Sequence, residues 1–181
     1  MILVGVTGAS GAIYARLLLN ELHDIKMEQQ VSVVFSEKAK EVWTHEIGAF
    51  PSDFPFKVYE NDDFNAPFAS GSSFCDTMIV CPCSMGTMGK IANGLSDTLI
   101  ARAADVALKE RRRLILAIRE TPVSLIHINN MQKLAQAGAI IAPASPSFYS
   151  HPKTVEELAM TVVVRLMQLA GIEKESYKWG E

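Results

Sequence analysis

The sequence predicts an α/β protein in which a parallel β-sheet carries helices on both faces. Two observations support this prediction: apolar runs of strand length recur along the chain, and helical patterns of apolar residues fall between them. Such alternation is typical of parallel sheets, because each pair of parallel strands needs a crossover connection. The ligand site of such a sheet lies beyond the carboxyl ends of its strands.

The expected strands span residues 2–7, 30–35, 77–81, 114–118 and 139–142. The expected helices span residues 12–22, 37–47, 85–92, 96–109, 124–137 and 155–170. Residues 49–73 are rich in Pro, Asp, Asn, Gly and Ser, which predicts a long loop around a short strand at 56–59.

The first strand and helix enclose a glycine-rich turn, GVTGASGAIYARLLL at residues 5–19. The strand is apolar and β-branched, and Ile13 and Leu17 begin a helical pattern. The helix would direct free N–H groups at a ligand, and Gly8 and Gly11 would let it approach closely, so the turn predicts an anion site. The glycine spacing matches neither the dinucleotide fingerprint nor the P-loop, and a plain tight turn stays an open alternative.

The next two strands end in hydroxyl residues. Ser36 follows the second strand, where a nicotinamide enzyme would usually carry an acidic residue, so this end suits a phosphate better than a ribose diol. Ser84 follows the third strand as a helix N-cap, a ligand contact or both. Cys81 and Cys83 are expected to be small buried residues, because three clustered cysteines without a nearby histidine do not complete a zinc site.

The last elements carry cations. Arg119 follows the fourth strand, and Arg165 interrupts the apolar helix at 155–170, where a charge needs a phosphate or carboxylate as its partner. The three arginines at 111–113 are interpreted as a solvated helix end rather than a site. Residues 177–181 are a candidate flap.

Composition bounds the class of protein. The 181 residues, 49% hydrophobic and 20% charged, fit a single domain over residues 1–181 with a sizeable core. A net charge of -3 argues against nucleic-acid binding by the protein as a whole. No leader and no apolar run of about 20 residues is found, so we expect a cytoplasmic protein without a membrane span.

Four clusters at strand ends are expected to meet over one edge of the sheet: residues 8–11, 36, 83–87 and 119–122. Their hydroxyls, N–H groups and arginine suit a phosphorylated, planar ligand. No histidine is placed to activate Ser10 or Ser84, which argues against a Ser-His-Asp hydrolase. Small residues at 101–108 permit a tight homo-oligomer, so cations of one subunit could serve a neighbour's site. The candidate cationic and aromatic residues are Lys109, Arg119, Tyr149 and Arg165, with Arg102 on the preceding helix.

Six motifs in order carry a family resemblance. They are GASGA from residue 8, ASGSS from 69, CPCSMGT from 81, ERRRLILAIRETP from 110, HINNM from 127 and PASPSFY from 143. Together they resemble flavin prenyltransferases of the UbiX type, from the first strand to the WGE at the end of the chain. The alignment is unsettled only between residues 49 and 65.

The resemblance implies a Rossmann-like, flavodoxin-like fold with a doubly wound, three-layer sheet, assembled as a homododecamer that binds FMN at subunit interfaces. It implies transfer of the dimethylallyl group of dimethylallyl phosphate to reduced FMN, at flavin atoms N5 and C6. The product, prenylated FMN, would serve UbiD-type decarboxylases, as in ubiquinone biosynthesis. No Asp-rich motif for a magnesium diphosphate is found, which fits a metal-independent reaction with a monophosphate donor.

The resemblance also implies roles for individual residues. Ser10, Glu46 and Glu120 match catalytic positions. The donor-binding positions match Lys109, Arg119, Tyr149 and Arg165. The FMN-contacting positions match Gly8, Ala9, Ser10, Ser36, Ser84, Met85, Gly86, Thr87 and Arg119.

Two alternatives stay open. FMN-dependent cysteine decarboxylases share the expected fold and flavin site, but they place a Pro-x-Met-Asn clamp where this chain has His127-Ile128-Asn129-Asn130-Met131. A non-enzymatic FMN carrier would keep the flavin clusters, but it would leave Tyr149 and Arg165 without a purpose.

Overall fold

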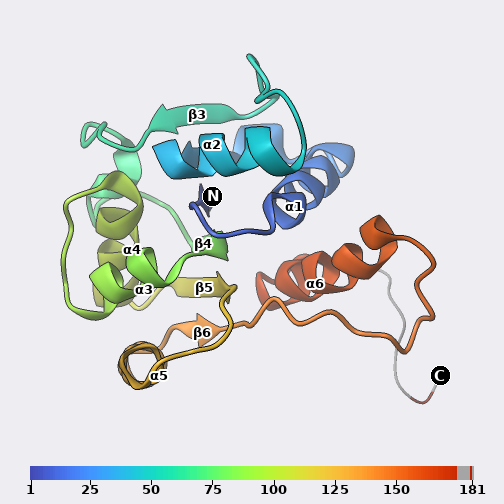
Figure 1. Cartoon of the computed structure of the whole chain (residues 1–181). Coiled ribbons are helices and arrows are strands. Elements are labelled where there is room, and N and C mark those ends of the chain that lie inside the picture. The colour runs from blue at the N-terminus through green and yellow to red at the C-terminus, as the bar shows by residue number, and fades with distance from the viewer. Residues whose placement is uncertain (175–179, 181) are drawn as a thin grey trace.

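Six parallel strands form one sheet in the computed structural model, which describes residues 1–174 and 180. The strand order is β3-β2-β1-β4-β5-β6, and every neighbouring pair is parallel (Figure 1). The strands are β1 (Ile2–Val6), β2 (Val31–Phe35), β3 (Lys57–Glu60), β4 (Thr77–Cys83), β5 (Arg113–Ile118) and β6 (Ile140–Ile141).

In the part of the chain that the structure describes, six α-helices cover the two faces of the sheet, which confirms the predicted doubly wound α/β fold (Figure 1). One face packs on α1 (Ala12–Asp24), α2 (Glu37–Glu46) and α6 (Val155–Leu169). The other packs on α3 (Met85–Ala92), α4 (Leu99–Lys109) and α5 (Leu125–Gln136).

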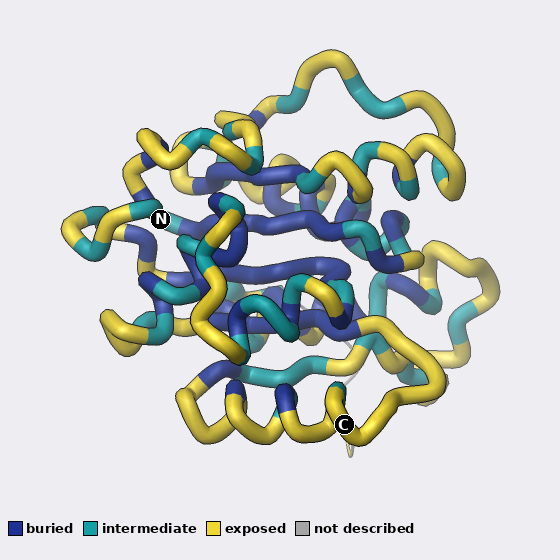
Figure 2. The backbone as a smooth tube through the Cα atoms, turned by 60° about the vertical axis from the view of Figure 1, so that its left-hand side comes forward, coloured by how far each residue is buried: buried dark blue, intermediate teal, exposed yellow. Residues whose placement is uncertain are grey.

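Strand side chains alternate between these two layers. Val4 and Ile79 belong to the apolar cluster under α1 and α6, whereas Leu3 and Met78 belong to the cluster under α3 and α4. All five residues of β1 are buried, as expected for a central strand with both faces covered (Figure 2). The core therefore consists of two apolar layers, one on each face of the β-sheet.

The chain reverses its direction of travel across the sheet after β3. It proceeds from β1 outward to β2 and β3, then returns to the other side of β1 and continues through β4, β5 and β6. This reversal creates a topological switch point between β1 and β4, where loops from neighbouring strands diverge and leave room for a ligand.

The predicted element boundaries differ from the structure by a few residues. The fourth helix begins at Leu99 and not at residue 96, because the Thr98 hydroxyl caps it by accepting a hydrogen bond from the Ala101 N–H at 3.3 Å. The long loop contains β3 and a short 3-10 helix, η2 (Pro67–Ala69), and another 3-10 turn, η1 (Glu28–Gln30), precedes β2. The candidate flap at 177–181 lies outside the described residues apart from Gly180.

Within the described residues, no helix has the length and apolar character needed to span a membrane.

Candidate functional site

The ends of β1, β2, β4 and β5 are joined by hydrogen bonds at the carboxyl edge of the sheet. The Ser36 N–H donates to the Val6 carbonyl at 2.9 Å, and the Arg119 N–H donates to the Cys83 carbonyl at 3.4 Å. The Ser84 N–H donates to the Thr7 hydroxyl at 2.8 Å, and that hydroxyl donates to the Pro82 carbonyl at 2.8 Å. The structure thus brings the four predicted clusters to one edge.

The N-terminus of α1 is occupied by a carboxylate of the protein itself. Glu46, the last residue of α2, accepts hydrogen bonds at Oε2 from the N–H groups of Gly11 at 2.9 Å and Ala12 at 2.8 Å. A carboxylate is favourable there because the free N–H groups and the helix dipole both attract negative charge. The turn thus holds a carboxylate of the protein itself, and the predicted binding of a ligand's anion there stays a prediction.

The reason for glycine in this turn also differs from the prediction. A Cβ on Gly8 would lie 2.5 Å from the Cβ of Lys38, so the missing side chain makes room for α2. Gly11 has φ of 108°, a left-handed conformation that favours glycine, and a Cβ there would lie 2.8 Å from the Tyr14 ring. Both glycines therefore serve internal packing, and the prediction that they also let a ligand approach stays a prediction.

Glu46 is held in its ionised form. Partial burial raises the pKa of Glu46, but hydrogen bonds from the Ser10 hydroxyl and the N–H groups of Gly11 and Ala12, together with the Arg119 charge, outweigh burial. The pKa of Glu46 consequently lies below its ordinary value. Ser10 and Glu46, two of the three predicted catalytic residues, are thus direct neighbours, and Arg119 is close enough to act on Glu46.

Tyr14 joins this cluster although the sequence analysis did not single it out. Its ring lies against Gly11, and its hydroxyl is close enough to Arg119 and Cys81 to sense both. Burial is the largest cause that raises the pKa of Tyr14, and nearby Cys81 raises it further, while the Arg119 charge offsets only part of this rise. The phenol is therefore a neutral hydrogen-bond donor. In the sequence, the signal for this role is the position of Tyr14 near the start of the helix that follows the glycine-rich loop.

The N-terminus of α3 is the better candidate for a phosphate. Ser84 caps it, with its hydroxyl accepting from the Thr87 N–H at 3.3 Å and donating to the Thr87 hydroxyl at 3.1 Å. Helix geometry leaves the N–H groups of Met85 and Gly86 without an intrahelical acceptor. Apart from Gly86 itself, its chain neighbours and the adjoining helix backbone, no described heavy atom lies within 4 Å of the position that a Cβ on Gly86 would take. A ligand can therefore approach this helix end.

Ser36 and Glu120 have local partners at the same edge. The Ser36 hydroxyl caps α2 by accepting from the Ala39 N–H at 3.1 Å, which leaves its own hydrogen to donate. The carboxylate of Glu120 accepts from the Thr121 N–H at 3.0 Å and is exposed. Ala9 is buried in the turn beside Gly8.

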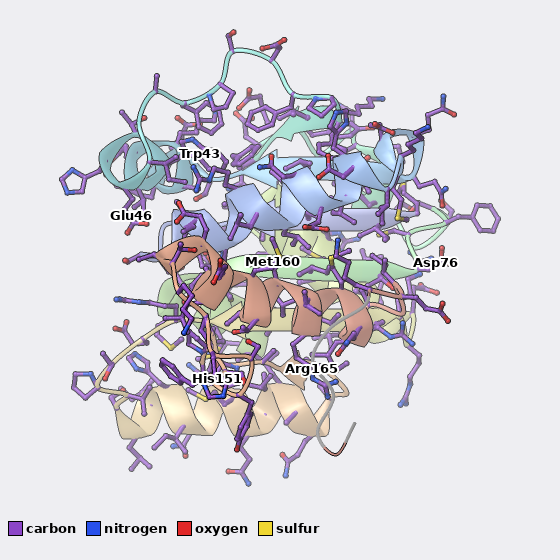
Figure 3. All side chains as sticks on the ribbon, turned by 90° about the vertical axis from the view of Figure 1, so that its right-hand side faces the viewer. Trp43, Glu46, Asp76, His151, Met160 and Arg165 are labelled. Carbon is purple, nitrogen blue, oxygen red and sulfur yellow. The ribbon has the colours of Figure 1, made fainter. Side chains whose placement is uncertain are left out.

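Lys109 lies at the opposite edge of the sheet. It ends α4, and β5 begins only four residues later, where the Arg113 N–H donates to the Asp76 carbonyl at 3.2 Å. Six residues of β5 separate this edge from Arg119, about 20 Å along the strand. Figure 3 shows the two ends of the sheet, with Glu46 at one and Asp76 at the other. Lys109 and Arg119 of one subunit therefore do not face the same ligand.

Tyr149 and Arg165 belong to a third region, where the loop after β6 runs along α6. Together with Met160 on α6, Arg165 lines a groove of about 710 Å³ between this loop and the helix. Figure 3 labels Met160 and Arg165 on α6 and His151 on the loop. Arg165 is exposed, and its Nη1 donates to Oε1 of Gln168 at 3.4 Å. Arg165 therefore interrupts the apolar sequence on the exposed side of α6, and its predicted phosphate or carboxylate partner stays a prediction.

The cysteines are buried as predicted. Cys81 and Cys83 are 1% and 0% exposed, and burial raises the pKa of each thiol well above its ordinary value. Neutral, enclosed thiols of this kind are poor nucleophiles and poor metal ligands. Among the described residues, no group of three His, Cys, Asp or Glu side chains is arranged to hold a metal ion.

Comparisons with known proteins identify the relatives of this chain. The model of the Flavoprotein family matches residues 1–167. A flavin prenyltransferase UbiX from Methanocaldococcus jannaschii is 45% identical, covering 99% of this chain and 98% of that protein. The crystal structure of AnUbiX in complex with FMN and dimethylallyl pyrophosphate is 39% identical, with a TM-score of 0.89 over 98% of this chain and 97% of the other.

Two further structures bear on assembly and on the alternative activity. A dodecameric, FMN-dependent UbiX-like decarboxylase from Escherichia coli is 38% identical, with a TM-score of 0.92 over 98% of each chain. An FMN-dependent cysteine decarboxylase from thioviridamide biosynthesis is 18% identical, with a TM-score of 0.63 over 90% of this chain and 97% of the other. The latter likeness shows a shared fold alone.

Proposed function

The chain belongs to the flavoprotein family and, within it, to the flavin prenyltransferases of the UbiX type, and we propose that its site joins a dimethylallyl group to reduced FMN at N5 and C6. The donor in this proposal is dimethylallyl phosphate, and the product is prenylated FMN. The observation that carries the proposal is the carboxyl edge of the sheet, where ionised Glu46 and Arg119 lie beside the switch point. A relative named as a flavin prenyltransferase matches almost the whole chain.

The residues of this edge fit FMN. The free end of α3, with open space at Gly86 and hydroxyls at Ser84 and Thr87, suits the phosphate of the flavin nucleotide. The hydroxyl of Ser36 can donate to the same group from the neighbouring strand end. Gly8 and Ala9 would then contribute the floor beneath the ring rather than phosphate contacts. Bound reduced FMN supplies the nucleophilic ring atoms of the reaction.

The residues around the flavin would act on charge and protons. Arg119 would attract the donor's phosphate as its C–O bond breaks and negative charge grows on oxygen. Glu46 stays ionised through its hydrogen bonds and can accept a proton or stabilise a nearby cation, while Ser10 holds the carboxylate in place. Glu120, next to Arg119 in sequence, is the third proposed catalytic residue. This arrangement uses side-chain cations in place of a metal ion.

The donor site requires more than one subunit. Lys109, Arg119 and Arg165 lie in three separate regions of one chain, so we propose that neighbouring copies bring them together with Tyr149 around the donor's phosphate. The proposed assembly is a homododecamer, because the related structure from Escherichia coli is dodecameric. We also propose one domain over residues 1–181, a cytoplasmic location, and delivery of the product to a UbiD-type decarboxylase.

Anaerobic incubation with reduced FMN and dimethylallyl phosphate, followed by mass spectrometry of the flavin, tests the proposed reaction. Release of CO₂ from a peptidyl or pantothenoyl cysteine would instead support the cysteine decarboxylase. A protein that binds FMN and performs neither reaction would be the carrier.

A further inference from the structure

Two arginines hold the loop at residues 69–73 through its backbone carbonyls. Arg102 on α4 donates from Nε to the Ala69 carbonyl at 2.9 Å, and Arg112 donates from Nη2 to the Gly71 carbonyl at 2.6 Å. Arg112 is half-buried, and its Nη1 is enclosed without a hydrogen-bond partner among the described residues. The interpretation of all three arginines at 111–113 as a solvated helix end is therefore wrong for Arg112.

The loop held in this way lies beside the ends of the Lys109 and Glu110 side chains. A Cβ added to Gly71 would lie 2.3 Å from Oε1 of Glu110 and 3.1 Å from Nζ of Lys109. Lys109 and Glu110 form an ion pair at 3.1 Å. Gly71 does not have the left-handed φ that favours glycine, so space for this ion pair is what its missing side chain provides.

Stability alone does not account for this construction. The side chains of Lys109 and Glu110 are 49% and 39% exposed, and an exposed ion pair contributes little to the free energy of folding. Leaving an arginine nitrogen enclosed without a partner is itself unfavourable. The arrangement does, however, restrict where a long and otherwise mobile lysine can place its ammonium.

We propose that Arg112 is a positioning residue that, through Gly71, fixes the ammonium of Lys109 for the donor's phosphate in a neighbouring subunit. The connection runs from the Arg112 guanidinium to the Gly71 carbonyl, and from Gly71 to the Lys109–Glu110 pair that fills the space a Cβ on Gly71 would take. The link between Arg112 and Lys109 rests on these contacts. Its use for phosphate binding rests on the function proposed above.

The kinetic test compares Arg112→Gln and Gly71→Ala with Arg111→Gln. Arg111 is exposed and adjacent, so it serves as the matched control. We expect Arg112→Gln and Gly71→Ala to raise the KM for dimethylallyl phosphate about 10-fold, with FMN affinity and the sedimentation coefficient unchanged. Arg112→Lys should recover part of the loss, because it restores one donor to the Gly71 carbonyl. The control should match wild type.

A double-mutant cycle separates positioning from general structure. If Arg112 acts through Lys109, Arg112→Gln should have no further effect on the donor's KM in a Lys109→Ala background. Equal effects of Arg112→Gln in both backgrounds would overturn the proposal. So would an Arg112→Gln variant that lowers only the melting temperature.

A readout without substrate tests the contact directly. The rate of reductive methylation of Lys109, followed by peptide mass spectrometry, should rise in Arg112→Gln and stay at the wild-type value in Arg111→Gln. An unchanged rate in Arg112→Gln would contradict the positioning role. If the rate rises while Lys109→Ala leaves the donor's KM unchanged, Arg112 positions Lys109 but the phosphate role of Lys109 is wrong.

Discussion

At the scale of single residues, Glu46 supplies a carboxylate to the glycine turn from within the protein. Its carboxylate, at the end of α2, accepts hydrogen bonds from the N-terminus of α1, although Glu46 lies 34 residues along the chain from Ala12. The motif GASGA predicted an anion at this helix end, but no local pattern in the sequence points to a partner so far away. Only the folded pairing of β1 with β2 brings α2 alongside the turn.

Glu46→Gln should destabilise the protein in a pH-dependent way. The pKa of Glu46 is lowered in the folded state from its ordinary value of 4.5, so the ionised carboxylate stabilises the fold above that value. The stabilisation is lost as the pH falls through the folded-state pKa. At about pH 7 the variant should lose roughly 0.5–1 kcal/mol of unfolding free energy, since the side chain is exposed and screened.

Urea unfolding of both proteins at about pH 7 and about pH 3.5 measures this difference, which should shrink at the lower pH. A difference of the same size at both values would mean that shape, and not charge, accounts for the effect.

Arg165→Ala should retain FMN and lose prenyl transfer. The Nη1 of Arg165 donates to the Gln168 side chain at 3.4 Å, and the residue borders the groove beside α6. Removing a charge-assisted contact to a desolvated phosphate should reduce kcat/KM by about 30-fold to 1000-fold, or roughly 2–4 kcal/mol. Arg165→Lys should recover part of the activity.

Sedimentation of Arg165→Ala, a flavin titration and a turnover assay distinguish the outcomes. Dissociation of the oligomer would indicate a pair with a neighbour's carboxylate. An intact, FMN-bound oligomer with full turnover would contradict the phosphate role.

At the scale of elements, the sequence predicted the strands and helices well because each signal is local. Buried parallel strands such as β1 and β4 are continuous apolar runs, and the helices between them follow the 3.6-residue period. The same topology already implied that Lys109, at the end of α4, lies at the opposite edge from Arg119. Lys109 and Arg119 were nevertheless assigned to one site, because they are close in sequence and both are positively charged.

The contacts between elements could not be predicted in the same way. Gly8 is glycine because Lys38 of α2 packs against it, and Gly71 because of the pair formed by Lys109 and Glu110. A glycine in a sequence shows that space or φ is needed, but not which neighbour needs it. The role of Arg112 was hidden for the same reason, since its partner is 41 residues away.

Two glycines of α3 offer a matched test of the FMN site. Ala in place of Gly should stabilise a helix by roughly 0.5–1 kcal/mol at both positions. A methyl group at 86 enters the open space at the helix start, whereas at 89 it meets Asn130 at an ordinary 3.5 Å. Gly86→Ala should therefore weaken FMN binding about 10-fold or more while raising the melting temperature of the FMN-free protein.

Gly89→Ala should raise the melting temperature and leave FMN affinity unchanged. A flavin fluorescence titration measures both variants. Equal affinities for Gly86→Ala and wild type would place the phosphate elsewhere.

At the scale of the whole molecule, the three separated cation regions make assembly part of the proposed chemistry. The subunit presents Arg119 at the carboxyl edge, Lys109 at the amino edge and Arg165 beside α6. A symmetric assembly can repeat these three surfaces around each flavin. Monomeric protein should accordingly bind the donor poorly even when FMN is present.

Chelation should leave the activity intact, because side-chain cations and not a metal ion would balance the leaving phosphate. Turnover measured with and without EDTA tests this expectation. Activity that EDTA abolishes and magnesium restores would contradict it.

The measurement that tests the proposed function most directly is mass spectrometry of the flavin after anaerobic incubation of the assembled protein with reduced FMN and dimethylallyl phosphate. The expected product is a flavin heavier by one five-carbon unit, abundant with wild type and strongly reduced with Arg165→Ala. Recovery of unmodified FMN from wild-type protein that has bound both compounds would contradict it.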